Sequence, residues 1–101
     1  MRIAAIALVA AFVLPATAFA VTDCSRAKTN TEKLLCSNSR LAEADQRMAV
    51  AFRTALNRGI KPDVLMESQA AWNRDARDAC NDVDCMLRAY EDRIFELDNL
   101  R

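Results

Sequence analysis

The sequence contains no histidine, and it has only one glycine and two prolines among its 101 residues. Histidine is the usual general base, the usual activator of a nucleophile and the commonest transition-metal ligand, so its absence argues against the most frequent catalytic and metal sites. The scarcity of glycine and proline leaves few of the turn residues that strands and hairpins need. We therefore expect helices throughout, with no metal and no cofactor.

The chain also lacks an excess of charge of either sign. It has 14 basic and 14 acidic side chains, and its formal net charge is +0. A balanced chain of this kind has no long-range field to attract nucleic acid or an anionic membrane surface. We expect neither of them as a partner.

The first twenty residues have the pattern of an export signal. An arginine is followed by an apolar run over residues 3–14 and by the small-x-small sequence Ala18-Phe19-Ala20, which signal peptidase cuts. Twelve apolar residues are too few to cross a bilayer as a helix, which takes roughly 20. Cys24 does not follow Ala20 directly, as the lipidated cysteine of a lipoprotein would. We expect residues 1–20 to be a cleaved signal peptide and the protein to be periplasmic or secreted, without a membrane anchor.

The remaining residues, 21–101, contain all four cysteines, Cys24, Cys36, Cys80 and Cys85. A domain of this size buries only about 60 % of its chain surface, so crosslinks are an expected source of stability. An even cysteine count in an exported chain indicates two disulfides. Three pairings are open to four cysteines, and the sequence does not choose among them. We favour pairing between neighbours, which would stabilise the domain by about 3 and 2 kcal/mol in the chain-entropy model.

Capping signals and apolar periodicity divide residues 21–101 into one short and three longer helices. Thr29 and Glu32 form a capping-box pattern before a short helix that reaches Cys36. The polar residues 37–39 cap a second helix, and Gly59 suits its left-handed end. Its inward face is expected to hold Leu41, Ala44, Met48, Ala51, Phe52, Ala55 and Leu56.

Pro62 suits the first turn of a third helix, and the polar turn 81–84 precedes a fourth. The inward stripe of the third helix would be Leu65, Gln69, Trp72, Ala76 and Ala79, and the seam of the fourth would be Leu87, Tyr90, Ile94, Leu97 and Leu100. The predicted fold is therefore a small, all-α, disulfide-bonded helical bundle.

Several short motifs occur in a characteristic order along this bundle. They are Asp23-Cys24-Ser25-Arg26-Ala27, Thr31-Glu32-Lys33 before Cys36, Leu41-Ala42, Asp45, Phe52, Gln69 with Trp72, Arg77-Asp78-Ala79-Cys80, Cys85, Leu87, Tyr90, Arg93-Ile94 and Leu97. With this order and spacing, residues 21–101 resemble the LprI-type lysozyme-inhibitor family of exported bacterial proteins. Relative to the family pattern, the stretch from Trp72 to Cys80 is one residue longer and the turn between Cys80 and Cys85 is one shorter.

The resemblance implies a helical, disulfide-bonded envelope protein that blocks lysozyme. It also singles out a set of motif residues for which we expect structural roles: Glu32, Asp45, Gln69, Trp72, Tyr90 and Arg93. We expect Trp72 to fill the core and Gln69 to hydrogen-bond a helix end beside it; the alternative is that an exposed Trp72 is a partner-binding hot spot. The hydroxyl of Tyr90 should find a backbone carbonyl near a disulfide.

Acidic residues gather around the end of the third helix and the turn that follows it. A partner-binding surface there would consist of Arg77, Asp78, Asn81, Asp82 and Asp84. Its charge would complement a basic lysozyme surface, with Asn81 or Arg77 donating hydrogen bonds to the enzyme's carboxylates. The alternative, which we favour, is that these residues are solvated turn residues and helix caps.

The sequence supports a binding protein better than an enzyme, because four thin helices offer no obvious pocket for a paired-carboxylate mechanism. The first hypothesis is an exported, non-enzymatic inhibitor that occludes the cleft of lysozyme or a related peptidoglycan hydrolase. The alternatives are a periplasmic structural or assembly factor and a toxin-immunity protein, each binding an envelope partner. No catalytic residue is predicted.

Overall fold

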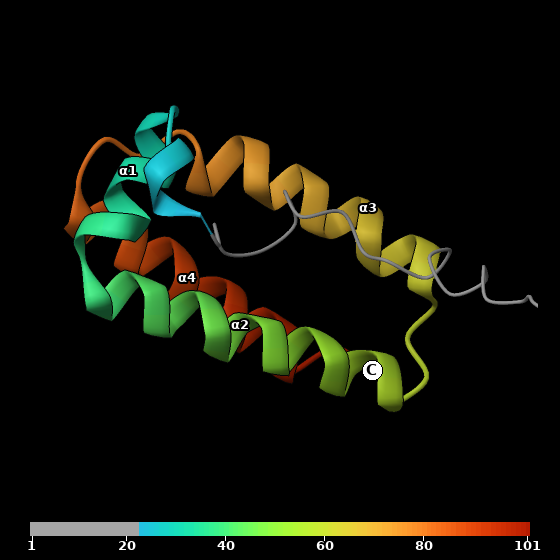
Figure 1. The fold of residues 1–101 in the computed structure, drawn as a ribbon. Coiled ribbons are helices and arrows are strands. Elements are labelled where there is room, and N and C mark those ends of the chain that lie inside the picture. Colours follow the sequence, from blue (N-terminus) through green and yellow to red (C-terminus); the bar gives the residue numbers. More distant parts are fainter. Residues whose placement is uncertain (1–22) are drawn as a thin grey trace, which may run out of the picture.

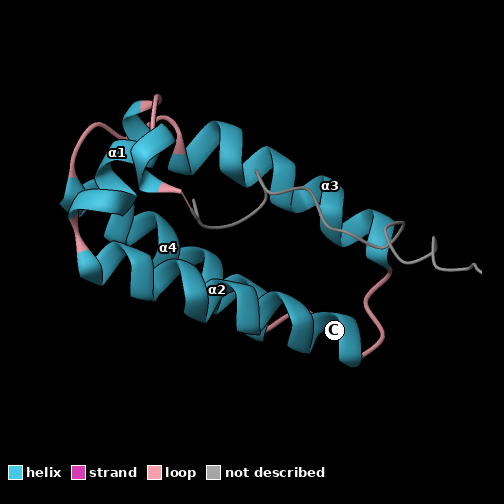
Figure 2. Cartoon of the chain, in the orientation of Figure 1, coloured by secondary structure: helices cyan, strands magenta, loops and turns pink. Residues whose placement is uncertain are grey.

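The computed structural model describes residues 23–101, which form helices joined by short loops and turns (Figure 1; Figure 2). The helices are α1 (Asn30–Ser37), α2 (Ser39–Asn57), α3 (Pro62–Trp72) and α4 (Val83–Asp98), with a 3-10 turn at Cys24–Arg26 and a π-helical turn at Asn73–Arg77. One short and three longer helices confirm the predicted all-α class. None of these helices is both long and apolar enough to span a bilayer. The predicted signal peptide, residues 1–20, lies outside the described residues.

The predicted helix ends are present. The Thr29 hydroxyl oxygen accepts a hydrogen bond from the Glu32 amide at 3.0 Å, and a Glu32 carboxylate oxygen accepts from the Thr29 amide at 3.1 Å, which completes the capping box of α1. The Asn38 side chain caps α2 by accepting from the amides of its first turn. Gly59 follows α2 with a φ of 100°, a conformation that side-chain-bearing residues rarely adopt.

Helices α2 and α4 run parallel, side by side, and α3 returns in the opposite direction (Figure 1). Cross-helix contacts fix this direction: Arg47 pairs with Glu91 at 2.7 Å, and further along both helices an Arg58 guanidinium nitrogen donates to the Leu97 carbonyl at 2.6 Å. Helix α1 closes one end of the bundle. The apolar side chains packed between the helices form the core of the domain.

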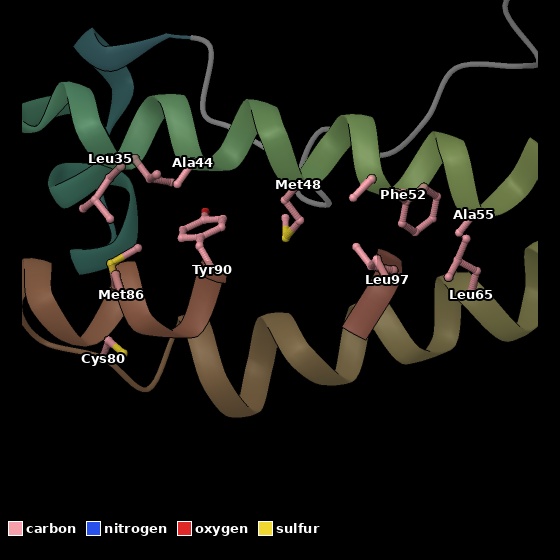
Figure 3. Packing of buried hydrophobic residues seen from close by; sticks show 12 residues of the cluster. Leu35, Ala44, Met48, Phe52, Ala55, Leu65, Cys80, Met86, Tyr90 and Leu97 are labelled. Atoms are coloured by element: carbon pink, nitrogen blue, oxygen red, sulfur yellow. The ribbon is translucent and has the colours of Figure 1, made fainter. Parts of the chain in front are cut away.

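The core is built mainly by α2 and α4 (Figure 3). On α2, Leu41, Ala44, Met48, Ala51, Phe52 and Ala55 are buried as predicted, and they meet Leu35, Leu65, Cys80, Met86, Tyr90 and Leu97. Leu56, which was also predicted on this face, is only partly buried. The predicted seam of α4 needs a correction. Leu87, Ile94 and Leu100 are only partly buried, because the buried stripe of α4 steps through Met86, Tyr90, Arg93 and Leu97.

The end of the third helix also differs from the prediction. The amide of Asp78 donates to the Asn73 carbonyl at 2.8 Å, a five-residue span that makes this turn π-helical and adds one residue to it. Within that turn the inward position passes to Arg77, so Ala76 is only partly buried, and Ala79, which follows the turn, is exposed.

The structure confirms the favoured disulfide pairing, Cys24–Cys36 and Cys80–Cys85. The first bond ties the 3-10 turn to α1. The second clamps the connection between the π-helical turn and α4. Two such bonds are typical of proteins that fold in an oxidising compartment.

The two disulfides differ in exposure, which predicts their order of reduction. Cys24 is exposed, whereas Cys80 is only 3 % exposed. Thiol–disulfide exchange requires access of the attacking thiolate to sulfur, so a limiting amount of dithiothreitol should reduce Cys24–Cys36 several-fold faster than Cys80–Cys85. Alkylation followed by peptide mass spectrometry measures the order. In denaturant the difference should disappear, and equal rates in the native protein would contradict the prediction.

Candidate functional site

The residues predicted to bind a partner lie at the end of the bundle that α1 closes (Figure 1). There the Thr31 hydroxyl donates to an Asp78 carboxylate oxygen at 2.9 Å, and the Asn30 amide group donates to the Cys80 carbonyl at 3.1 Å. These bonds join α1 to the connection between the π-helical turn and α4. The sequence does not predict these bonds, because no local pattern links residues that are 47 and 50 positions apart.

Two of the predicted binding residues are occupied by contacts within the domain. Arg77 is only 7 % exposed, and its guanidinium donates to an Asp78 carboxylate oxygen at 2.9 Å. Burial alone would lower the pKa of Arg77, but the hydrogen bond to Asp78 and nearby charge hold the pKa above its usual value. Arg77 is therefore a charged internal residue at the end of the π-helical turn and is not presented to a partner.

The other predicted binding residues lie on the surface of the same end. Asp82 accepts a hydrogen bond from the Cys85 amide at 2.9 Å and so caps α4. Asn81 and Asp84 are exposed, and within residues 23–101 their side chains make no hydrogen bond or ion pair. Among the described residues of this end, Asn81 thus offers a free donor and Asp84 a free acid.

A buried polar pair lies beneath this end and joins α2 to α4. The Tyr90 hydroxyl, which is fully buried, donates to an Asp45 carboxylate oxygen at 2.8 Å, and the side chain of Asp45 is also buried. The expectation of a backbone carbonyl as acceptor is wrong, because Asp45 faces Tyr90 across the parallel helix pair. Trp72 is partly buried and packs edge-on against the Tyr90 ring at 5.1 Å.

The surroundings of Tyr90 keep its hydroxyl protonated. Burial, and then the negative charge of Asp45, raise the pKa of Tyr90 well above its usual value. A phenol that stays neutral keeps donating its hydrogen bond to Asp45 throughout the physiological pH range. The pair therefore acts as a permanent link between the two parallel helices.

A second buried polar group joins α3 to α4. Arg93 is 5 % exposed, and its guanidinium donates to the Gln69 side-chain oxygen at 2.9 Å and to the Ser68 hydroxyl at 2.7 Å. The predicted helix-end partner of Gln69 is also present, since its amide nitrogen lies 3.4 Å from the Asn73 side-chain oxygen. The shorter bond, however, goes to Arg93.

Glu32 completes the set of motif residues at the start of α1. Its carboxylate accepts from the backbone amides of Lys28 and Thr29 at 2.7 and 3.1 Å, and these bonds lower its pKa. The motif residues therefore hold helices in place: Glu32 caps α1, Asp45 and Tyr90 join α2 to α4, Gln69 and Arg93 join α3 to α4, and Trp72 packs on Tyr90.

A surface hollow lies within the part of the chain that the structure describes. A shallow hollow beside the Cys24–Cys36 disulfide is lined by Leu35, Ala42 and the polar residues 37–39, with no acid or base among them. In residues 23–101, no three side chains of cysteine, aspartate or glutamate gather as a cation site.

Three large apolar side chains are exposed on the surface of the described residues. Val50 is 53 % exposed, Val64 is 54 % exposed and Phe95 is 70 % exposed. The helical periodicity of α4 is the sequence signal that predicts the exposure of Phe95. Phe95 lies two residues from both Arg93 and Leu97, which are buried, so it points away from the core.

The sequence is similar to proteins named Lipoprotein LprI. It is 32% identical over 79 residues to Lipoprotein LprI of Mycobacterium bovis and to the same protein in two strains of Mycobacterium tuberculosis. The alignment covers 74% of this chain and 39% of those proteins, so the chain spans about two fifths of their length. No family model matches the sequence. No solved structure matches it either.

Proposed function

We propose that this chain is an exported, non-enzymatic binding domain of the LprI type that inhibits lysozyme or a related peptidoglycan hydrolase by occluding its cleft. The observation that carries the proposal is the similarity to Lipoprotein LprI over 74% of the chain. It agrees with the order of the sequence motifs, which resembles the LprI-type lysozyme-inhibitor family. Export is supported by the pattern of residues 1–20 and by the two disulfides.

The construction of the domain suits an inhibitor that acts by binding alone. Two disulfides and two buried polar links hold the helices in one arrangement. A rigid binding surface loses little conformational entropy when it meets its partner, so more of the contact energy appears as affinity. Occlusion of a cleft needs such a surface and no catalytic group on the inhibitor.

Lysozyme turnover on cell walls tests the proposal. The oxidised protein, purified after export, should slow the clearing of a peptidoglycan suspension in proportion to its concentration. The same protein with both disulfides reduced and alkylated is the control, and it should inhibit less because its surface is no longer held in place. Unchanged turnover at a large molar excess of the oxidised protein would remove the inhibitor claim.

A further inference from the structure

The layer formed by α2 and α4 has an outer face that points away from α3. The buried stripe of α4 passes through Tyr90, Arg93 and Leu97, and Phe95 lies on the opposite side of the helix. Its 70 % exposure is the highest among the large apolar residues described as exposed. Because Phe95 contributes little to the core, its side chain is available to a partner.

Val50 lies on the same outer face, at about the same height along the helix axes as Phe95. The ion pair between Arg47 and Glu91, at 2.7 Å, sets two facing positions on the parallel helices. Val50 comes three residues after Arg47, and Phe95 comes four residues after Glu91. With a rise of about 1.5 Å per residue, both apolar side chains lie one turn beyond the ion pair.

On the surface of α4, the exposed charges nearest to Phe95 are acidic, whereas Val50 on α2 is flanked by Arg47 and Arg53. Asp92 and Asp98 are exposed and lie three residues before and after Phe95, which puts all three on neighbouring turns of one helix surface. Within residues 23–101 no ion pair engages either aspartate. The nearest exposed arginines along the chain are Arg101, six residues after Phe95 and beyond the end of α4, and Arg88, seven residues before it and about 10 Å away along the helix.

Resting on the proposed function, we propose that this outer face is where the inhibitor meets a cationic peptidoglycan hydrolase, with Phe95 as the apolar anchor, Val50 beside it and Asp92 and Asp98 as an acidic rim. An exposed aromatic side chain is the type of residue that dominates binding energy when it enters a pocket on a partner. An acidic rim selects a partner whose pocket is surrounded by lysine and arginine. An enzyme that acts on an anionic wall polymer gains from such a basic surface.

The full exported protein and a purified cationic c-type lysozyme provide the test. Phe95→Ala should weaken binding by about tenfold or more in calorimetry and weaken inhibition in parallel, while its thermal midpoint stays unchanged. Val64→Ala, which truncates an exposed apolar residue of α3, is the matched control and should bind like the wild type. The double variant D92N/D98N should associate more slowly and depend less on salt concentration than the wild type.

The outcomes separate the surface assignment from the function itself. Wild-type binding that survives Phe95→Ala unchanged overturns the assignment and leaves the inhibitor function standing. Absence of wild-type binding overturns the proposed function, and the assignment with it. Sedimentation analysis tests whether a second copy of the chain covers this face instead. A wild-type dimer that dissociates on Phe95→Ala substitution would show that it does, and would also overturn the assignment.

Discussion

Replacing Asp45 by alanine is expected to lower the free energy of unfolding by about 3 kcal/mol. The substitution removes the acceptor of the Tyr90 hydroxyl, which is fully buried and bonded to Asp45 at 2.8 Å. A buried donor left without its acceptor loses its hydrogen bond to water without replacement. Urea unfolding followed by circular dichroism measures the change.

Controls separate this loss from a general effect of removing an acid. Asp98→Ala truncates an exposed acid of α4, and we expect it to change the free energy of unfolding by no more than about 0.5 kcal/mol. Asp45→Asn keeps an oxygen that can accept from Tyr90, so its effect should be smaller than that of Asp45→Ala. A loss below about 0.5 kcal/mol for Asp45→Ala would show that the pair does not stabilise the domain.

The free energy of unfolding is also expected to fall strongly at alkaline pH. The folded state raises the pKa of Tyr90 above its usual value through burial and the charge of Asp45, whereas in the unfolded chain it returns to about 10. The stability that the protonated hydroxyl confers is therefore fully present below about pH 10. It falls above that pH, by about 1.4 kcal/mol per pH unit, because the unfolded state releases a proton that the folded state retains.

Tyrosinate absorbance provides a direct measurement, because Tyr90 is the sole tyrosine of the chain. The ionised form should stay undetectable above pH 10 while the helices are intact, and it should appear together with the loss of helical circular dichroism. Tyr90→Phe should lose this component of the alkaline transition. Tyrosinate that forms near pH 10 in a fully helical protein would contradict the expected shift.

The sequence predicted the helices and the disulfides because both depend on local signals. The capping box of Thr29 and Glu32 and the apolar periodicity of α2 are patterns within a few residues. The pairing of Cys24 with Cys36 and of Cys80 with Cys85 joins positions 12 and 5 apart. Helices of this kind form from neighbouring residues, so local patterns predict them, whereas the disulfide pairing is favoured among three open pairings.

The π-helical turn, the buried polar pairs and the candidate binding face depend on contacts between distant segments, which local patterns do not contain. The π-helical turn replaces an α-helical hydrogen bond with one from Asp78 to Asn73, and this choice turns Arg77 inward. Tyr90 and Asp45 are 45 positions apart, and Arg93 and Gln69 are 24 apart. The candidate binding face likewise needed the α2 and α4 register, which the Arg47–Glu91 pair defines.

The edge-on contact between Trp72 and Tyr90 gives the folded chain an intrinsic fluorescence signal. These are the only tryptophan and the only tyrosine of the sequence, and their ring centres are 5.1 Å apart. At this separation, light absorbed by the phenol reaches the indole by resonance transfer, so the intact domain emits with a single indole spectrum. Phenol emission then signals that α3 has separated from α4, and no dye or label is needed to follow it.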